Sequence, residues 1–181
     1  MTTCTLFSGE TLIGIGALIV SIVSVLYTVL SFRAQRIHNR KSVKPIGIIT
    51  VGDYENKIFI RIDNNGIGPL IIKKLEVKNK TRTTTSVIDI IPDDLCKKIV
   101  WSTFAAKVED KALLAGDKLL LIEYRPDYSD PNLDKEKSET IKEELRKALK
   151  GIHIYLDYTD VYEKEIFQVD RSMEWFGRHF E

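Results

Sequence analysis

The chain contains 181 residues, with 27 Lys and Arg against 26 Asp and Glu, and its formal net charge is +1. This length suits one domain of ordinary size plus a small appendage, and a hydrophobic content of 44% excludes a wholly disordered chain. The near-zero charge excludes a strongly basic nucleic-acid binder, so we expect no nucleic-acid partner. Two cysteines, Cys4 and Cys96, are too few for a disulfide-rich secreted scaffold.

An uncharged run occupies the N-terminal part of the chain, from Thr11 to Phe32. As a helix rising about 1.5 Å per residue, these 22 residues span the hydrocarbon layer of a bilayer, which is about 30 Å thick. A buried core helix would carry a polar face, and a cleaved signal peptide would carry positive charge before the apolar run. The preceding residues contain only one charged residue, Glu10. We therefore predict a retained single transmembrane helix over 11–32.

A basic run without acids follows the span and predicts its orientation. Lys and Arg are enriched on the cytoplasmic side of membrane helices. We therefore expect a short external tail over 1–10, a basic stem over 33–44 and a cytoplasmic domain over 45–181, attached to the inner (cell) membrane. The basic side chains serve as a general anchor to lipid headgroups or, alternatively, recognise one anionic lipid. The predicted headgroup-binding residues are Arg33, Arg36, Arg40, Lys41 and Lys44.

Small residues form a stripe along the predicted span, at alternating steps of three and four residues. That spacing places them on one seam of a helix. Helices associate in lipid through close packing and hydrogen bonding, so the seam predicts a contact with a second copy or with another membrane protein. A ring of such helices lining a polar pore is a further hypothesis, and hydroxyls that bond their own backbone are the alternative. The stripe consists of Gly14, Ala17, Ser21, Ser24, Thr28 and Ser31.

From residue 45 onward the pattern changes to the alternation of strands, with turn-forming residues at short intervals. Ile58, Ile60 and Ile62 share one face of a strand that follows the polar turn 53–56, which is typical of a hairpin. Strands are predicted over 45–51, 57–63, 70–79, 81–91, 103–108, 118–125, 152–159 and 165–169.

Two helices are predicted within this β-rich part. The shorter one, over 92–100, begins with a proline and two acids, and the longer one, over 135–150, precedes Gly151 as a cap. The segment 127–134 is predicted to be a loop, and the end of the chain is predicted to pack Trp175 and Phe176 as a closing element. We predict a mainly β fold, either an immunoglobulin-like β-sandwich or a small β-barrel, with the longer helix inserted on its surface.

Three segments together resemble a recurring type of small bacterial inner-membrane protein. They are HNRKSVKP directly after the span, DNNGIGPLIIKKLEV in the first half of the domain, and LDYTDVYEKEIF near the end. Proteins of that type are mostly uncharacterised, and they combine one or two membrane helices with a cytoplasmic β-domain. Some small membrane proteins with β-domains are effectors of anti-phage defence, and the resemblance implies such a role here.

The sequence carries no motif for catalysis or metal binding. It lacks a GxSxG elbow, a phosphate-binding loop and a CxxC pair, and its three histidines share no metal-ligand spacing. We therefore expect no enzymatic activity, no cofactor and no metal, and the sequence identifies no small-molecule ligand. Asp157, Asp160 and Glu163 surround the last predicted hairpin with three tyrosines, and indicate either a small polar site or a solvated hairpin.

These features indicate a membrane-anchored, non-enzymatic interaction or sensing module. Its expected partners are membrane lipids and either a second copy of the chain or another membrane protein. Oligomerisation that perturbs the inner membrane would make the protein a defence effector. The alternative is a constitutive accessory subunit that anchors a larger membrane complex.

Overall fold

The structure is a computed structural model that describes residues 9–126, 128 and 134–180. The chain forms two compact units, one ending at Ser42 and the other beginning at Val43. Most of the predicted external tail and most of the predicted loop 127–134 lie outside the described residues.

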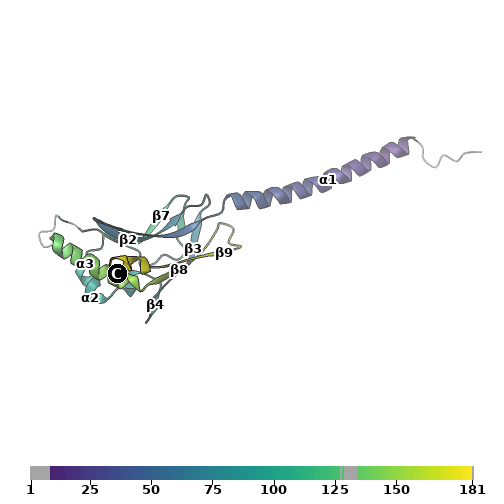
Figure 1. Ribbon diagram of the computed structural model, residues 1–181. Helices are drawn as coiled ribbons and strands as arrows, with labels where there is room; N and C mark the ends of the chain where they lie inside the picture. Colours follow the sequence, from purple (N-terminus) through teal and green to yellow (C-terminus); the bar gives the residue numbers. More distant parts are fainter. Residues whose placement is uncertain (1–8, 127, 129–133, 181) are drawn as a thin grey trace, which may run out of the picture. The chain divides into compact units, whose positions relative to one another are not determined.

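The first unit contains one helix, α1 (Gly9–Ser42), which is labelled in Figure 1. It is long and apolar enough to cross a membrane, and none of its residues is buried, so it is not a core helix of the described chain. Its 34 residues correspond to a length of about 51 Å. The predicted basic stem is therefore helical as far as Ser42.

The second unit contains two antiparallel sheets, of which the first has the strand order β1-β2-β7-β5. The first two strands form the predicted hairpin, but they continue through Asp53 and Tyr54, so that only Glu55 and Asn56 make the turn. The alternating isoleucines of β2 are fully buried, as their spacing predicts. The strands are β1 (Gly47–Tyr54), β2 (Lys57–Asn64), β5 (Thr103–Phe104) and β7 (Lys118–Tyr124).

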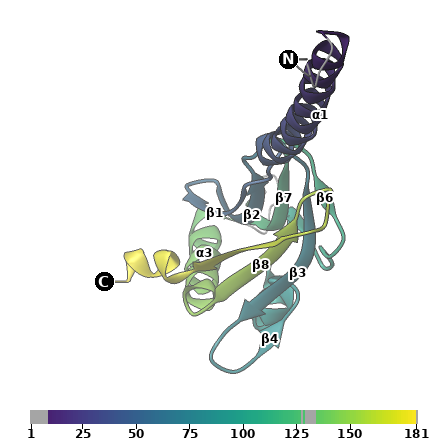
Figure 2. The same ribbon diagram turned by 90° about the vertical axis from the view of Figure 1, so that its right-hand side faces the viewer.

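The second sheet has the strand order β4-β3-β8-β9, and the short β6 also pairs with β3. Strands β3 and β8 lie side by side along most of their length, as Figure 2 shows. Strand β9 extends three residues beyond the predicted strand 165–169 because Asp170, Arg171 and Ser172 continue the ladder with β8. The strands are β3 (Leu70–Lys78), β4 (Thr83–Thr84), β6 (Ala112–Leu113), β8 (His153–Thr159) and β9 (Ile166–Ser172).

The prediction of a strand over 81–91 is wrong beyond Thr84. The short β4 is followed by a 3-10 helix, η1 (Ile88–Ile90), and Val87 and Ile91 on either side of it are buried. These β-branched residues fill the core from an irregular segment, because burial outweighs their intrinsic preference for a strand. The predicted strand 103–108 is likewise reduced to the two residues of β5, and β6 was not predicted.

Two helices and a C-terminal 3-10 turn complete the domain: α2 (Asp93–Lys98), α3 (Lys135–Lys150) and η2 (Glu174–His179). Helix α3 has the predicted bounds, and Leu145 and Leu149 on one of its faces are fully buried. The Asp134 carboxylate caps it by accepting a hydrogen bond from the Lys137 amide at 2.7 Å. In η2 the Phe176 side chain is fully buried, whereas the Trp175 side chain is exposed.

One hydrophobic core is shared by both sheets and by α3. Neither sheet closes on itself among the described strands, so the predicted alternative of a barrel is not formed. The most deeply buried contributions come from Ile49, Ile58, Ile60, Ile62 and Ile122 of the first sheet, and from Leu70, Ile72, Leu75, Val77, Ile154 and Leu156 of the second.

The chain enters this domain beside the NNGIGP segment, which begins at Asn64, the last residue of β2. The side-chain nitrogen of Asn64 donates to three backbone carbonyls, including that of Gly68, and its side-chain oxygen accepts from the amides of Ile46 and Gly66. A Cβ atom on Gly68 would overlap the carbonyl oxygen of Val43. The glycines of this predicted turn are therefore required for close backbone approach.

Candidate functional site

The structure places all six residues of the predicted small-residue stripe on α1. Three of the hydroxyls donate to the carbonyl four residues earlier, Ser21 and Ser24 at 2.8 Å and Thr28 at 2.7 Å. Serine and threonine commonly satisfy their donors in this way within helices. Each oxygen keeps a free lone pair, so the stripe can still accept hydrogen bonds from a neighbouring helix.

The predicted headgroup-binding residues divide between the two units. Arg33, Arg36 and Arg40 follow one another at steps of three and four on α1, which places them on one helix face, and Lys41 lies on the same helix. Lys44 follows the helix, and its ammonium lies 4.4 Å from the centroid of the Phe167 ring. A cation–π contact therefore holds Lys44 on the β-domain.

The outer face of the second sheet carries a continuous set of polar side chains. Successive residues of a strand point to opposite faces, so the residues that alternate with the core side chains of β3, β8 and β9 point outward. The strand register sets Lys74 opposite Asp157, and Tyr155 between Glu76 and Asp170. We call this set the polar face; it comprises Lys74, Glu76, Lys78, His153, Tyr155, Asp157, Gln168 and Asp170.

The Glu76 carboxylate lies between two ammonium groups on this face. It pairs with Lys74 and, at 2.7 Å, with Lys78. Hydrogen bonds from Lys74 and then Lys78 lower the pKa of Glu76 to about 2, and the hydrogen bond to Glu76 raises the pKa of Lys74. The three groups lie at the surface, so dissolved salt screens the interaction and its contribution to stability is small.

An aromatic stack occupies the centre of the polar face. The rings of His153 and Tyr155 stack with centroids 4.5 Å apart, and the Lys78 ammonium lies 4.7 Å from the Tyr155 centroid. The Nε2 atom of His153 lies 2.7 Å from the Asp170 carboxylate. The Tyr155 ring is therefore fixed by its neighbours while 38% of the residue stays exposed.

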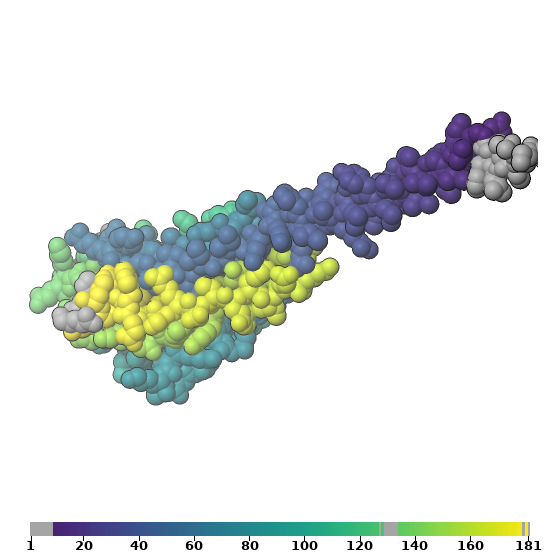
Figure 3. Space-filling view, turned by 45° about the vertical axis from the view of Figure 1, so that its right-hand side comes forward, coloured from purple at the N-terminus to yellow at the C-terminus, as the bar shows by residue number. Residues whose placement is uncertain are grey.

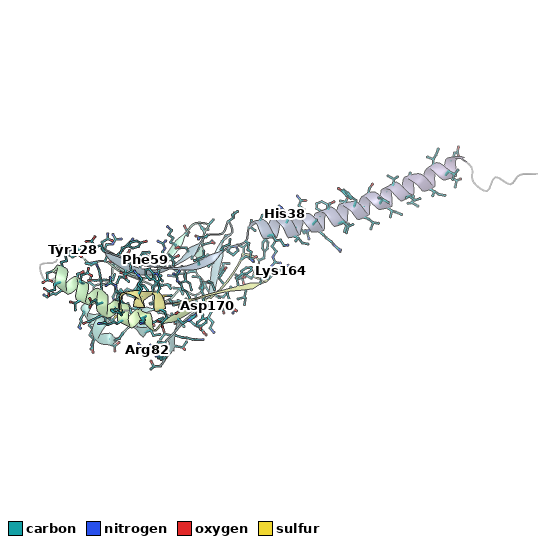
Figure 4. All side chains as sticks on the ribbon, viewed as in Figure 1. His38, Phe59, Arg82, Tyr128, Lys164 and Asp170 are labelled. Carbon is teal, nitrogen blue, oxygen red and sulfur yellow. The ribbon has the colours of Figure 1, made fainter. Side chains whose placement is uncertain are left out.

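An open pocket of about 380 Å³ lies on this face, lined by Lys74, Glu76, Tyr155, Asp157, Gln168, Val169 and Asp170. The Gln168 amide donates to Asp157 at 3.1 Å, and Asp170, labelled in Figure 4, lies on β9. The walls contain charges of both signs and one aromatic ring. Such a lining suits a polar segment of another molecule that brings its own donors and acceptors.

The structure separates the acidic residues that the sequence grouped around the last hairpin. Asp157 lines the pocket, Asp160 is buried and accepts a hydrogen bond from the Tyr162 amide at 2.8 Å, and Glu163 pairs with Lys73 at 3.3 Å. Within the described part of the chain, no group of three or more His, Cys, Asp or Glu side chains is arranged to hold a metal ion. The cation-binding interpretation of this hairpin therefore has no geometric support.

Sequence reasoning missed an arginine clamp around Asp53 at the end of β1. The Asp53 side chain is only 1% exposed and accepts hydrogen bonds from Nε and Nη2 of Arg146, both at 2.9 Å, and from Arg178 at 3.2 Å. The hydrogen bond to Asp53 raises the pKa of Arg146. No sequence pattern reveals the clamp, because its members lie far apart in the chain and each resembles an ordinary surface charge.

Comparison with protein-family models, with curated proteins and with solved structures found no match to this chain.

Proposed function

We propose that the protein is a single-pass membrane protein of the bacterial inner membrane, with the N-terminus outside and the β-domain in the cytoplasm. The exposed apolar surface of α1 supports membrane insertion, since such a surface is costly in water. The cations that follow the span, and the absence of cations before it, support the orientation.

Cysteine labelling tests this placement with the two native cysteines. In a Cys96→Ser variant, a membrane-impermeant maleimide should label Cys4 in intact cells. In a Cys4→Ser, Cys96→Ser, Tyr54→Cys variant, labelling should require permeabilised cells, because Tyr54 is an exposed residue of the domain. The reverse pattern, or release of the protein by alkaline carbonate, contradicts the proposal.

We infer that the two sheets form an immunoglobulin-like sandwich. The order β1-β2-β7-β5 corresponds to strands A-B-E-D of that fold, and β4-β3-β8-β9 corresponds to C′-C-F-G. In this correspondence α3 is an insertion between strands E and F. The side chains that both sheets contribute to one core support the inference.

We propose that this domain is a non-enzymatic recognition module that binds another protein through the polar face. The observation that carries the proposal is the pocket of about 380 Å³, in which the Tyr155 ring is fixed among charges of both signs. Exposed aromatic rings that are held in place lose little side-chain entropy on binding and are frequent hot spots of interfaces. The bound segment should be polar and of mixed charge, to complement Lys74 and Asp157.

Substitutions on the two outer sheet faces test this recognition role. Tyr155→Ala and Asp157→Lys should each reduce co-purification of the partner from native membranes at least tenfold, while the domain stays folded. Tyr54→Ala is the matched control, because Tyr54 is an exposed tyrosine on the first sheet. Equal loss with all three variants, or loss with none, contradicts a binding site on the polar face.

We further propose that the bound state promotes self-association of α1 through the small-residue stripe, and that the assembly perturbs the inner membrane as a defence effector. The seam of small residues and the resemblance to small bacterial membrane proteins support this role. When the partner that binds the polar face is present, induction of the full chain should arrest growth and admit an impermeant dye, whereas a Ser21→Leu, Ser24→Leu variant should do neither. Stable co-purification with a larger complex, without dye entry, identifies an accessory subunit instead.

A further inference from the structure

Strand β9 is the outer strand of the second sheet, and its free edge is long. It pairs with β8 over all seven residues, and the described strands provide no partner on its other side. The other sheet edges are shorter or lie close to β9: β4 and β5 contain two residues each, and the Arg171 side chain of β9 itself donates to the Ile49 carbonyl of β1 at 2.7 Å, without a backbone ladder between β1 and β9. Figure 3 shows the C-terminal segment that includes β9 as a band on the surface of the domain.

The hydrogen-bond pattern identifies which backbone groups of β9 point outward. The Met173 amide donates to the Ile152 carbonyl directly opposite it, so pairs at steps of two from this one exchange hydrogen bonds with β8. The same alternation holds on β3: the Ile72 amide donates to the Lys111 carbonyl and the Ile72 carbonyl accepts from the Asp110 amide, so both backbone groups of Ile72 point away from β8. The N–H and C=O groups that point away from β8 therefore belong to Ile166, Gln168, Asp170 and Ser172.

The edge of β9 carries one of the usual protections against pairing, the charged Arg171 on its core-facing side, but it lacks the others. The strand sequence, IFQVDRS, contains no proline, glycine or lysine, and the register with β8 has no bulge. Edges of this length that lack proline, glycine, lysine and bulges are templates for another strand. Because its residues alternate regularly between the two faces, β9 can accept a strand in extended antiparallel register.

We propose that β9 pairs with β9 of a second copy of this chain, antiparallel and centred on Val169. In this register Gln168 of each copy lies opposite Asp170 of the other on the polar face, so an amide donor faces a carboxylate. On the opposite side of the strands, Arg171 lies opposite Phe167, so no like charges meet there. A register centred on Asp170 would oppose two carboxylates, and one centred on Gln168 would leave Asp170 opposite Ile166.

This register also uses every outward backbone group. Ile166 pairs with Ser172 and Gln168 with Asp170, and each of these pairs exchanges both of its hydrogen bonds. The two Val169 residues form a pair without mutual hydrogen bonds, in which the Cα atoms lie about 4.5 Å apart. The inference deepens the proposed self-association by placing a second contact between copies in the β-domain, distinct from the stripe on α1.

Disulfide trapping in the full-length protein tests the register. In a Cys4→Ser, Cys96→Ser background, Val169→Cys should form disulfide-linked dimers in membranes under mild oxidation, since the Cα separation falls within disulfide range. Gln168→Cys is the matched control, because Gln168 opposes Asp170 rather than itself, and should form few adducts. No adduct at Val169→Cys, or equal yields at both positions, overturns the inference.

Charge substitutions at Gln168 test the same pairing on an exposed side chain. Gln168→Glu places a second carboxylate opposite Asp170 of the other copy and should lower the yield of the Val169→Cys adduct about fivefold. Gln168→Lys places an ammonium there and should raise the yield by a similar factor. Adding Asp170→Lys to Gln168→Glu should restore the yield. Equal yields in all three variants overturn the register.

A parallel experiment with Ser21→Cys separates this contact from that of the span. Adducts at Ser21→Cys without adducts at Val169→Cys overturn the β9 pairing and leave the proposed function intact. Adducts at Val169→Cys alone support the β9 pairing and contradict association through the stripe.

Discussion

Arg146 on α3 and Asp53 at the end of β1 form a bidentate ion pair, with both nitrogen–oxygen distances at 2.9 Å. The pair fastens the inserted helix to the first hairpin, and Arg178 adds the C-terminal turn to the same carboxylate. Bidentate pairs fix orientation as well as distance, because the guanidinium fork matches the carboxylate. The clamp therefore joins three segments that local sequence does not connect.

Asp53→Asn should lower the free energy of unfolding of the domain by about 3 kcal/mol, since it leaves two guanidinium groups without their counter-charge in a largely buried site. The measurement is chemical denaturation of the purified full chain in detergent, followed by fluorescence of Trp101 and Trp175. Lys98→Met is the control, because it breaks the exposed pair between Lys98 of α2 and Glu144 of α3 and should cost under about 1 kcal/mol.

Gly68→Ala should destabilise the domain by about 3 kcal/mol, because the new Cβ atom would overlap the Val43 carbonyl and push the entering chain away from its site. Gly151→Ala adds the same methyl group where no atom lies within 4 Å and should change stability by less than about 1 kcal/mol. Comparable denaturation midpoints for the two variants contradict the close approach at Gly68.

The Glu76 carboxyl should titrate with a pKa of about 2, followed by NMR of its side-chain carbon. A pKa lowered on folding means that the ionised carboxylate stabilises the fold above its unfolded pKa, about 4.5, and that this stabilisation disappears as the pH falls toward 2. Glu76→Gln should therefore be less stable than the native chain at pH 7, and the difference should vanish only as the pH falls through about 2. Added salt should narrow the difference at pH 7.

Cysteines on the stripe of α1 should form cross-links between copies of the chain in membranes. Ser21→Cys and Ser24→Cys, in a background without native cysteines, place the thiols on the predicted contact seam. Ile22→Cys, on another face of the same helix, should give at least fivefold less adduct. Equal yields at the three positions indicate random collision and contradict a specific seam.

Periodic elements of the fold were predictable from the sequence, whereas its irregular elements were not. Helix α3 repeats Ile141, Leu145 and Leu149 among charged residues, and its structural bounds agree with the prediction. The prediction of a strand from Thr81 to Ile91 was wrong because its β-branched residues suit a strand, whereas in the structure they reach the core from a turn and a 3-10 helix. Local propensity cannot anticipate a conformation that tertiary burial selects.

The candidate site was predictable only in part, for a related reason. The tyrosine- and acid-rich hairpin that contains Tyr155 and Asp157 was predictable as a possible polar site. The lysines and the glutamate that complete the polar face lie on β3, some eighty residues earlier. Pairing of β3 with β8 is a long-range event that no local pattern encodes. The open edge of β9 likewise becomes visible only when the strand order of the second sheet is known.

Because α1 continues without a break through the stem, the angular positions of the stem residues are fixed relative to those of the span. No glycine or proline interrupts residues 33–42, so the angular position of Ser42 is set by that of Ser31 at about 100° per residue. One alanine inserted after Phe32 turns every later helical residue by about 100°, whereas seven inserted alanines return it nearly to its original angle. If binding at the domain promotes association of the span through this helix, we expect the one-alanine insertion to disturb the coupling and the seven-alanine insertion to preserve it.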